Sequence, residues 1–110
     1  MTVGELVEAL HLTAYALPEP ERAVTGAYAG DLLSWVMRRA QADGAWLTIM
    51  SNRNIVAVAT LTDVSAIVLT EGVPPDEGVA ELAEARGVNL LGSAADTLET
   101  GAALLERLNA

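Results

Sequence analysis

The sequence predicts an α/β fold in three layers, with helices flanking a mostly parallel sheet of four to five strands. The residues are 52% hydrophobic but only 4% aromatic, so Leu, Val, Ile and Ala must build the core, which suits helices packed on a sheet. Short apolar segments alternate with helical segments about every 20 residues, the pattern of right-handed β-α-β units in a Rossmann-like sheet. At 110 residues the chain has room for one core, and we expect a single domain over residues 1–110.

The first part of the chain predicts a helix followed by two extended pieces. Thr2 is placed to cap a helix over residues 3–10. The alternating residues 11–16 then predict a strand, which ends before two prolines. Residues 24–28 form a second, short extended piece.

A helix and a strand come next. Gly30 and Asp31 open the helix, with Asp31 as its cap, and Gly44 ends it. Five positions would form its apolar face: Leu32, Leu33, Val36, Met37 and Ala40. The β-branched and apolar residues 45–49 then predict a strand.

The middle of the chain contains the clearest strand. Residues 51–54 are polar, and residues 55–61 are apolar nearly all round, as in a short buried helix, with a buried strand as the alternative. Residues 65–70 predict a strand that ends at the turn Glu71-Gly72.

The last part predicts two helices around one more strand. Asp76 would cap a helix that runs to about Arg86 and stops at Gly87, before a strand over residues 88–91. The final helix begins at Ser93 or Asp96. Its apolar stripe would comprise Leu98, Ala102, Leu105 and Leu108.

Charge and composition exclude several classes of function. The net charge is −9, which repels nucleic acid and anionic lipid, and no apolar run is long enough to span a membrane. We expect a cytoplasmic protein, since no export signal is seen. The chain has no Cys, no Lys and one His, so thiolate catalysis, a P-loop, Schiff-base chemistry and the usual zinc sites are excluded. We expect no cofactor and no metal.

Three loops lie at strand ends, where α/β sheets bind ligands. Residues 25–31 have two glycines ahead of a helix, which suit either a phosphate or a tight turn. The second loop gathers hydroxyl, amide and guanidinium groups, so it could hold an anion or supply helix caps: Ser51, Asn52, Arg53 and Asn54. The third is either a ribose-binding turn or an exposed one: Thr70, Glu71 and Gly72.

Trp35 is expected to point away from the core. It lies on a different side of its helix from the predicted apolar face, together with Arg38 and Arg39. This arrangement predicts a homodimer interface. The alternative is that the Pro18–Arg22 loop of the same chain covers Trp35. His11 has no second His near it in sequence, so we expect no catalytic or metal role for it.

The chain resembles the DRTGG domain family over nearly its whole length. Four segments carry the resemblance, in order: Gly30–Ser34 with Met37, Trp46–Ile49, Asn54–Ala59, and Ile67–Gly72 with Pro75-Asp76. The small stand-alone members are most similar, and so are the amino-terminal domain of HPr kinase/phosphorylase and an inserted domain of some phosphotransacetylases. The resemblance implies a regulatory or assembly domain, often beside CBS domains, without kinase activity. Longer relatives place Asp-Arg where this chain has Asn52-Arg53.

These observations favour a non-catalytic regulatory module that binds a small anion or a nucleotide at its strand-end loops, as a homodimer. The alternative is a structural protein that assembles with a larger enzyme and has no small-molecule ligand. An enzymatic function would need Arg53 and nearby carboxylates to perform phosphoryl transfer or hydrolysis.

Overall fold

The computed structural model describes all residues, 1–110. Five helices and five strands follow one another along the chain in this order: α1 (Val3–Leu10), β1 (Thr13–Ala16), β2 (Gly26–Ala29), α2 (Leu33–Arg39), β3 (Gly44–Thr48), α3 (Asn54–Thr62), β4 (Ala66–Leu69), α4 (Val79–Ala85), β5 (Leu90–Gly92) and α5 (Thr97–Leu108). None of the five helices has the length and apolar character that a bilayer crossing requires.

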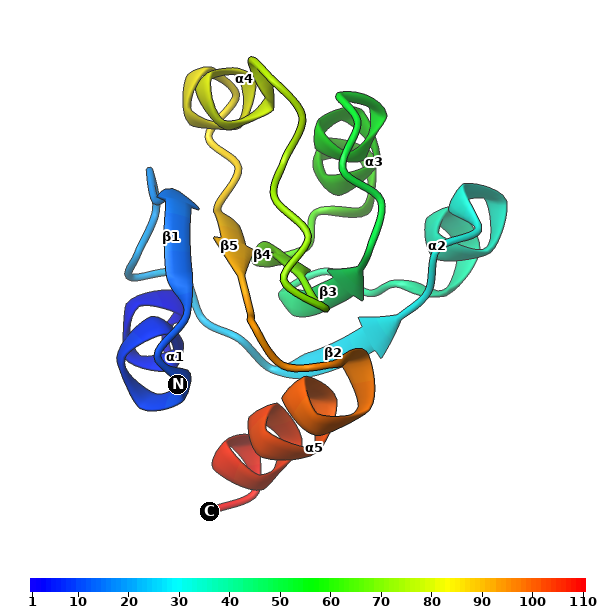
Figure 1. Cartoon of the computed structure of the whole chain (residues 1–110). Helices are drawn as coiled ribbons and strands as arrows, with labels where there is room; N and C mark the ends of the chain where they lie inside the picture. Colours follow the sequence, from blue (N-terminus) through cyan, green and yellow to red (C-terminus); the bar gives the residue numbers. More distant parts are fainter.

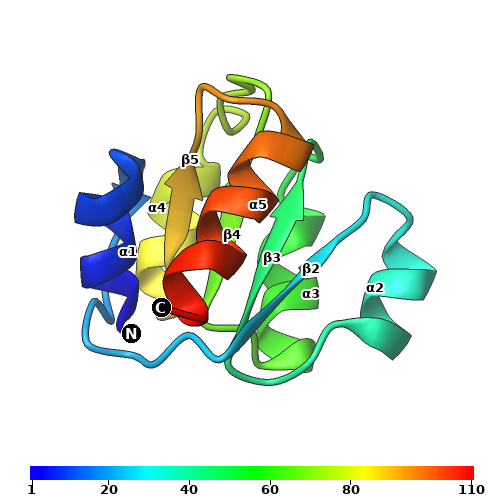
Figure 2. The same cartoon turned by 90° about the horizontal axis from the view of Figure 1, so that it is seen from below.

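The sheet has the strand order β1-β5-β4-β3-β2. Strands β2, β3, β4 and β5 are parallel to one another, whereas β1 pairs with β5 in the antiparallel direction. Helices α2, α3 and α4 cover one face, and α1 and α5 cover the other (Figures 1 and 2). The predicted three-layer, mostly parallel α/β fold is therefore confirmed.

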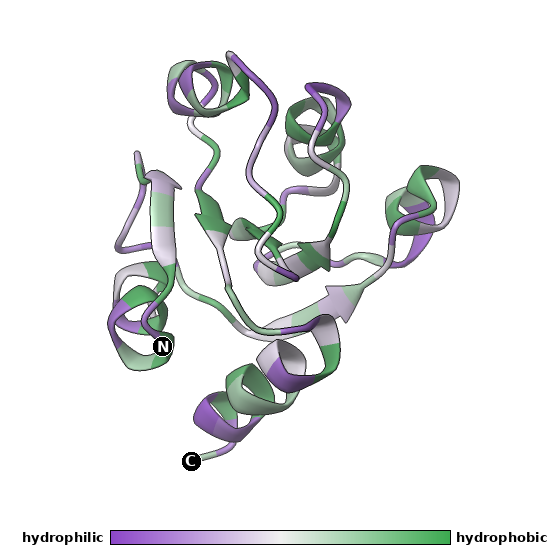
Figure 3. Cartoon of the chain, in the orientation of Figure 1, coloured by the Kyte–Doolittle hydropathy of each residue, from purple (hydrophilic) through white to green (hydrophobic).

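Two apolar clusters fill the space between the sheet and its helices. Side chains alternate across the strands, so Trp46 faces α2–α4 while the adjacent Leu47 faces α1 and α5. Ile67 and Val68 divide between the clusters in the same way. Figure 3 shows apolar segments on the central strands and alternating apolar and polar segments along the helices.

Several helix ends agree with the sequence analysis. Thr2 and Glu5 form a capping box at α1: the Glu5 N–H donates to Thr2 Oγ1 (3.1 Å) and the Thr2 N–H donates to Glu5 Oε1 (2.8 Å). Asp96 caps α5 through the Glu99 N–H at 2.7 Å. Residues 54–62 form a helix, so the alternative of a buried strand is wrong.

Two predicted caps are wrong. Asp31 does not cap α2, because its carboxylate accepts hydrogen bonds from Thr48 Oγ1 (2.8 Å) and from the Ile49 N–H (2.9 Å) at the end of β3. Asp76 does not cap α4, which begins after Gly78 at φ 85°, in the left-handed region. In both cases the carboxylate accepts hydrogen bonds from residues far away in sequence and not from the first turn of the helix.

Some predicted strand bounds also moved. His11 ends α1 in the left-handed conformation at φ 53°, so β1 starts at Thr13. The second extended piece lies at 26–29 rather than 24–28, and the last strand at 90–92 rather than 88–91.

The predicted apolar faces of α2 and α5 are only partly buried. Val36 is buried, but Leu32 and Met37 are exposed, because α2 packs mainly against α3 at the border of the sheet. On α5, Leu98 and Leu105 are exposed, and the buried residues are Thr100 and Leu104. The Thr100 hydroxyl shares a 2.8 Å hydrogen bond with Ser93 Oγ, which allows a polar side chain to face the sheet.

Candidate functional site

The carboxyl ends of β2, β3, β4 and β5 lie at one edge of the sheet, because these strands are parallel. Four loops leave the strands at this edge, and they comprise residues 30–32, 49–53, 70–78 and 93–96. Both predicted ligand-binding loops, 51–54 and 70–72, are therefore on the same edge. Open α/β sheets bind ligands at this position.

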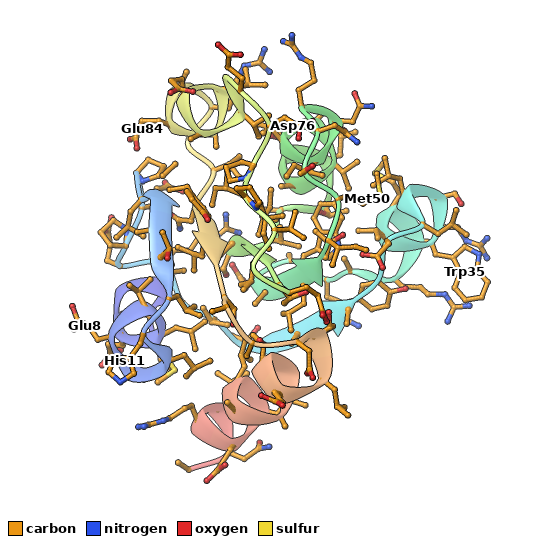
Figure 4. All side chains as sticks on the ribbon, viewed as in Figure 1. Glu8, His11, Trp35, Met50, Asp76 and Glu84 are labelled. Carbon is orange, nitrogen blue, oxygen red and sulfur yellow. The ribbon has the colours of Figure 1, made fainter.

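Hydrogen bonds join loop 49–53 to loop 70–78. Ser51 Oγ donates to Asp76 Oδ1 at 2.7 Å, and the Asp76 N–H donates to the Ser51 carbonyl oxygen at 2.9 Å. Figure 4 shows Asp76 on the side of α3 and α4. The Ser51 side chain therefore fixes a neighbouring loop, which local sequence patterns do not reveal.

The first turn of α3 has few free backbone donors. The Asn54 N–H donates to Asn52 Oδ1 (2.9 Å), as expected of a capping Asn. The Ile55 and Val56 N–H groups donate to carbonyl oxygens three residues back, at 3.2 Å each. An anion here would therefore depend on side chains rather than on N–H groups of the helix.

Arg53 is the free cation of this edge. It precedes α3, and its side chain is exposed and makes no hydrogen bond or ion pair. None of the other strand-end loops contains a basic residue. The exposed Asn54 side chain stands beside it in sequence and also makes no hydrogen bond. Arg53 and Asn54 thus carry exposed polar side chains without a partner at this edge.

Residues 70–72 hold the start of α5. Thr70 is buried, and its hydroxyl shares a 2.6 Å hydrogen bond with Thr97 Oγ1. Glu71 Oε2 accepts from the Thr97 N–H at 2.8 Å, and the Gly72 N–H donates to the Ser93 carbonyl oxygen at 3.0 Å. The Thr70 side chain offers no surface to a ligand in this arrangement, whereas Glu71 and Gly72 are exposed.

Acidic side chains outnumber basic ones at this edge, and several of them accept hydrogen bonds from the backbone. Asp31, Glu71 and Asp96 each accept a hydrogen bond from a backbone N–H group. The chain has no group of three or more His, Asp or Glu placed to hold a metal ion.

The predicted interface residues lie on α2, at the other side of the molecule from α1. Trp35 is 49% exposed, and the Arg39 guanidinium lies over its ring, 4.3 Å from the centroid. Figure 4 shows Trp35 pointing outward from α2, whereas the Pro18–Arg22 loop lies against the start of α1, where the Val3 and Gly4 N–H groups donate to the Arg22 and Pro20 carbonyl oxygens at 2.9 and 2.7 Å. The alternative in which that loop covers Trp35 is therefore wrong. Arg38 is also exposed and makes no ion pair.

The four segments that resemble the DRTGG family are neighbours in the fold. They form the start of α2, strand β3, helix α3, and strand β4 with the turn after it. The indole N–H of Trp46 donates to the Gly30 carbonyl oxygen at 2.9 Å, which ties two of these segments together. The profile of the DRTGG domain matches residues 8–107. This chain belongs to the DRTGG domain family.

A solved structure with a DRTGG domain has the same fold. It is the regulatory region, with CBS and DRTGG domains, of Clostridium perfringens pyrophosphatase complexed with its activator, diadenosine tetraphosphate. The match has a TM-score of 0.72 at 13% identity and covers 94% of this chain. The chain spans 46% of the length of that solved regulatory region. A search of curated proteins finds no match.

Proposed function

We propose that this DRTGG domain is a non-catalytic regulatory module that senses a small anion or a nucleotide at its strand-end loops. Family membership carries the proposal: the matched pyrophosphatase region is regulatory and holds a nucleotide activator. That region also contains CBS domains, so the proposal concerns the DRTGG part alone.

The geometry of Arg53 supports an anion site at the start of α3. The guanidinium has no carboxylate partner, so its donors are free for a phosphate or carboxylate group. The exposed Glu71 and Gly72 come from the strand next to β3 and would contact the remainder of a nucleotide. The chain's net charge of −9 makes a free Arg at this edge the main source of attraction for an anion.

The hydrogen bonding of the carboxylates supports a non-catalytic role. Each of these carboxylates already has a structural partner: Asp31 accepts from the Ile49 N–H and Asp76 from Ser51 Oγ, and Glu71 and Asp96 accept from N–H groups in the first turn of α5. The chain also lacks the Lys and P-loop that phosphoryl transfer of that kind uses.

Thermal unfolding with added ligands tests the proposal, because a ligand that binds only the folded state raises its stability. We expect diadenosine tetraphosphate, ATP, AMP or inorganic phosphate to raise the melting temperature in a saturable way. Replacing Arg53 with Ala should weaken binding by about 1.5 to 3 kcal/mol, the range for a hydrogen bond to a charged group.

Arg86→Ala is the matched control. Arg86 is also exposed and free of ion pairs, but it follows α4, away from the loops in question. Its replacement should leave binding unchanged. Equal affinity of wild type and a folded Arg53→Ala variant would contradict the site, and ATP turnover by the purified chain would contradict the non-catalytic role.

A homodimer is the second part of the proposal, and the exposed surface of α2 favours it. Trp35 is 49% exposed on α2, and two further apolar side chains, Leu32 just before this helix and Met37 on it, are 60% and 42% exposed. Exposed apolar groups of this kind mark interaction sites, and Trp is a favoured anchor. The same surface would serve the alternative function, assembly with a larger enzyme without a small-molecule ligand. The mass of the purified chain in solution separates the homodimer from this alternative. A homodimer has twice the mass of one chain, whereas a chain that assembles only with a larger enzyme is monomeric when purified alone.

A further inference from the structure

Neither the backbone conformation nor steric crowding requires glycine at position 26, the amino end of β2. A Cβ atom added there would meet no atom within 4 Å, and the residue is not in the left-handed region. Each of the other eight glycines either has positive φ or has neighbouring atoms within 4 Å of such a Cβ. Glycine inside a strand destabilises it by about 0.5–1 kcal/mol, and it often marks close approach of a ligand.

The space above Gly26 is part of a hollow of about 330 Å³. Gly26 and Gly44 are register partners in β2 and β3, so they face the same side of the sheet and leave a floor without side chains. Tyr28 and Val64 line the hollow, and the segment that joins α2 to β3 borders it. The hollow lies at the amino ends of the strands, away from the loops around Arg53.

The charge of the hollow is positive, although the chain has a net charge of −9. Arg39 is the one charged residue that lines it, and no acidic residue does. Arg39 makes no ion pair, and its guanidinium is held over the Trp35 ring. A free, positioned guanidinium suits a carboxylate or a phosphate group.

Asp43, the carboxylate nearest to Arg39 in sequence, already has a cationic partner in Arg22, which it shares with Asp63. Asp43 accepts a hydrogen bond from Arg22 at 3.1 Å, and the same Arg22 nitrogen contacts Asp63 at 2.9 Å. Partial burial by itself lowers the Arg22 pKa, but the hydrogen bonds to Asp43 and Asp63 outweigh it and leave this pKa raised. Arg22 thus stays charged beside Asp43, and Arg39 remains free for a ligand.

Polar donors stand at the border of the hollow. β2 is an edge strand, and the Thr25 N–H donates to the Asp43 carbonyl oxygen in the direction of β3. Successive peptide groups of a strand alternate in direction, so the Gly26 N–H points to the open side. The Gln41 side chain, which is exposed, adds an amide group.

We propose that this hollow binds a small ligand with one anionic group, a carboxylate or a phosphate. The apolar part of the ligand lies over the glycine floor, and its anionic group accepts hydrogen bonds from Arg39 and from the Gly26 N–H. The site is separate from the strand-end loops and does not depend on the function proposed for them.

Amide chemical shifts of the ¹⁵N-labelled chain test this site, with benzoate and phenyl phosphate as ligands that carry the two anions on the same ring. We expect saturable shifts at Gly26, Tyr28, Gln41 and Val64 with one or both. Arg39→Gln should bind about tenfold more weakly. The matched control is Arg38→Gln, the neighbouring arginine that does not line the hollow, and it should bind as the wild type does.

Gly26→Val places a branched side chain on the floor of the hollow and should strongly weaken or abolish the shifts. Val is favoured in strands, so this variant should keep the wild-type melting temperature or exceed it. Gly26→Ala serves if the larger residue disturbs folding, and it should weaken binding as well. Binding by a folded Gly26 variant with wild-type affinity would overturn the proposal. So would the absence of saturable shifts with either ligand up to about 10 mM, a concentration that detects even millimolar dissociation constants.

Discussion

The Glu71 carboxylate accepts a hydrogen bond from the Thr97 N–H at 2.8 Å, joining the end of β4 to the start of α5 across 26 residues. Glu71 has φ 62°, in the left-handed region, where a side chain other than Gly is strained. The turn thus keeps a strained residue whose carboxylate supplies a helix N-terminus with an acceptor.

Glu71→Ala should lower the free energy of unfolding by about 1 kcal/mol, the usual effect of removing a side-chain cap. The Thr97 N–H loses its acceptor, and Ala keeps the strain of the left-handed conformation. Urea unfolding followed by circular dichroism measures the change. Glu77→Ala is the control, because Glu77 is exposed in the same loop and makes no hydrogen bond. An equal loss in both variants would show that the contact with Thr97 contributes nothing.

Trp46 links the central strand to the loop before α2. Its side chain is fully buried, and its indole N–H donates to the Gly30 carbonyl oxygen at 2.9 Å. Trp46→Phe leaves that carbonyl without its partner and opens a small void, so the free energy of unfolding should fall by about 2 kcal/mol or more. Trp35→Phe is the control on a half-exposed Trp. Similar unfolding midpoints for the two variants would contradict this account.

The capping box at α1 predicts a dependence of stability on pH. The hydrogen bond from the Thr2 backbone N–H is the main reason that the Glu5 pKa lies below 4.5, with a contribution from the Thr2 side chain. A lowered folded-state pKa stabilises the protein above the unfolded-state value, and this stabilisation is lost as the pH falls through the folded-state pKa. The free energy of unfolding of the wild type should therefore fall as the pH drops from 4.5 through the folded-state pKa of Glu5.

Glu5→Gln keeps an acceptor for the Thr2 N–H but cannot titrate. The difference in unfolding midpoint between wild type and Glu5→Gln should shrink as the pH falls below 4.5. Glu8→Gln is the control on the same helix, since the Glu8 side chain is exposed and makes no hydrogen bond. If Glu8→Gln changes the pH profile as much as Glu5→Gln does, the capping box is not the cause.

The sequence predicted the elements whose signals are local. Strand β4 is a continuous apolar run, and α3 follows Asn52, whose side chain caps its first turn. Thr2 was expected to cap the first helix, and Asp96 was one of two candidates, with Ser93, for the start of the last helix; each accepts from an N–H three residues further on. Patterns of this length are fully visible in one sequence.

Contacts between distant residues were not predictable in this way. Asp31 and Asp76 were assigned as caps because each precedes a helix, yet they bond to residues 17 and 25 positions away. The antiparallel direction of β1 depends on how the chain returns to the sheet, which no local pattern shows. The hollow at Gly26 likewise appears only when Gly44 lies beside it in the sheet.

Trp35 supports the last prediction, self-association through α2. The residue is 49% exposed, and Arg39 stacks on its ring. Trp35 is also the largest of the exposed apolar side chains, so its outer surface is available to a second copy. A two-fold axis near this helix would bring Trp35 close to its own copy, with Arg38 reaching acidic residues at the rim. Such an interface tolerates no charge at its centre, because a buried carboxylate without a partner is strongly unfavourable.

Trp35→Glu should therefore be monomeric and remain folded, since a half-exposed side chain contributes little to the stability of the single chain. Sedimentation equilibrium of wild type and variant at tens of micromolar measures the mass directly. Leu61→Glu is the matched control: Leu61 is 71% exposed on α3, outside the proposed interface, so this change should leave the dimer intact. A monomeric wild type at that concentration would exclude the dimer, and a dimeric Trp35→Glu would place its interface elsewhere.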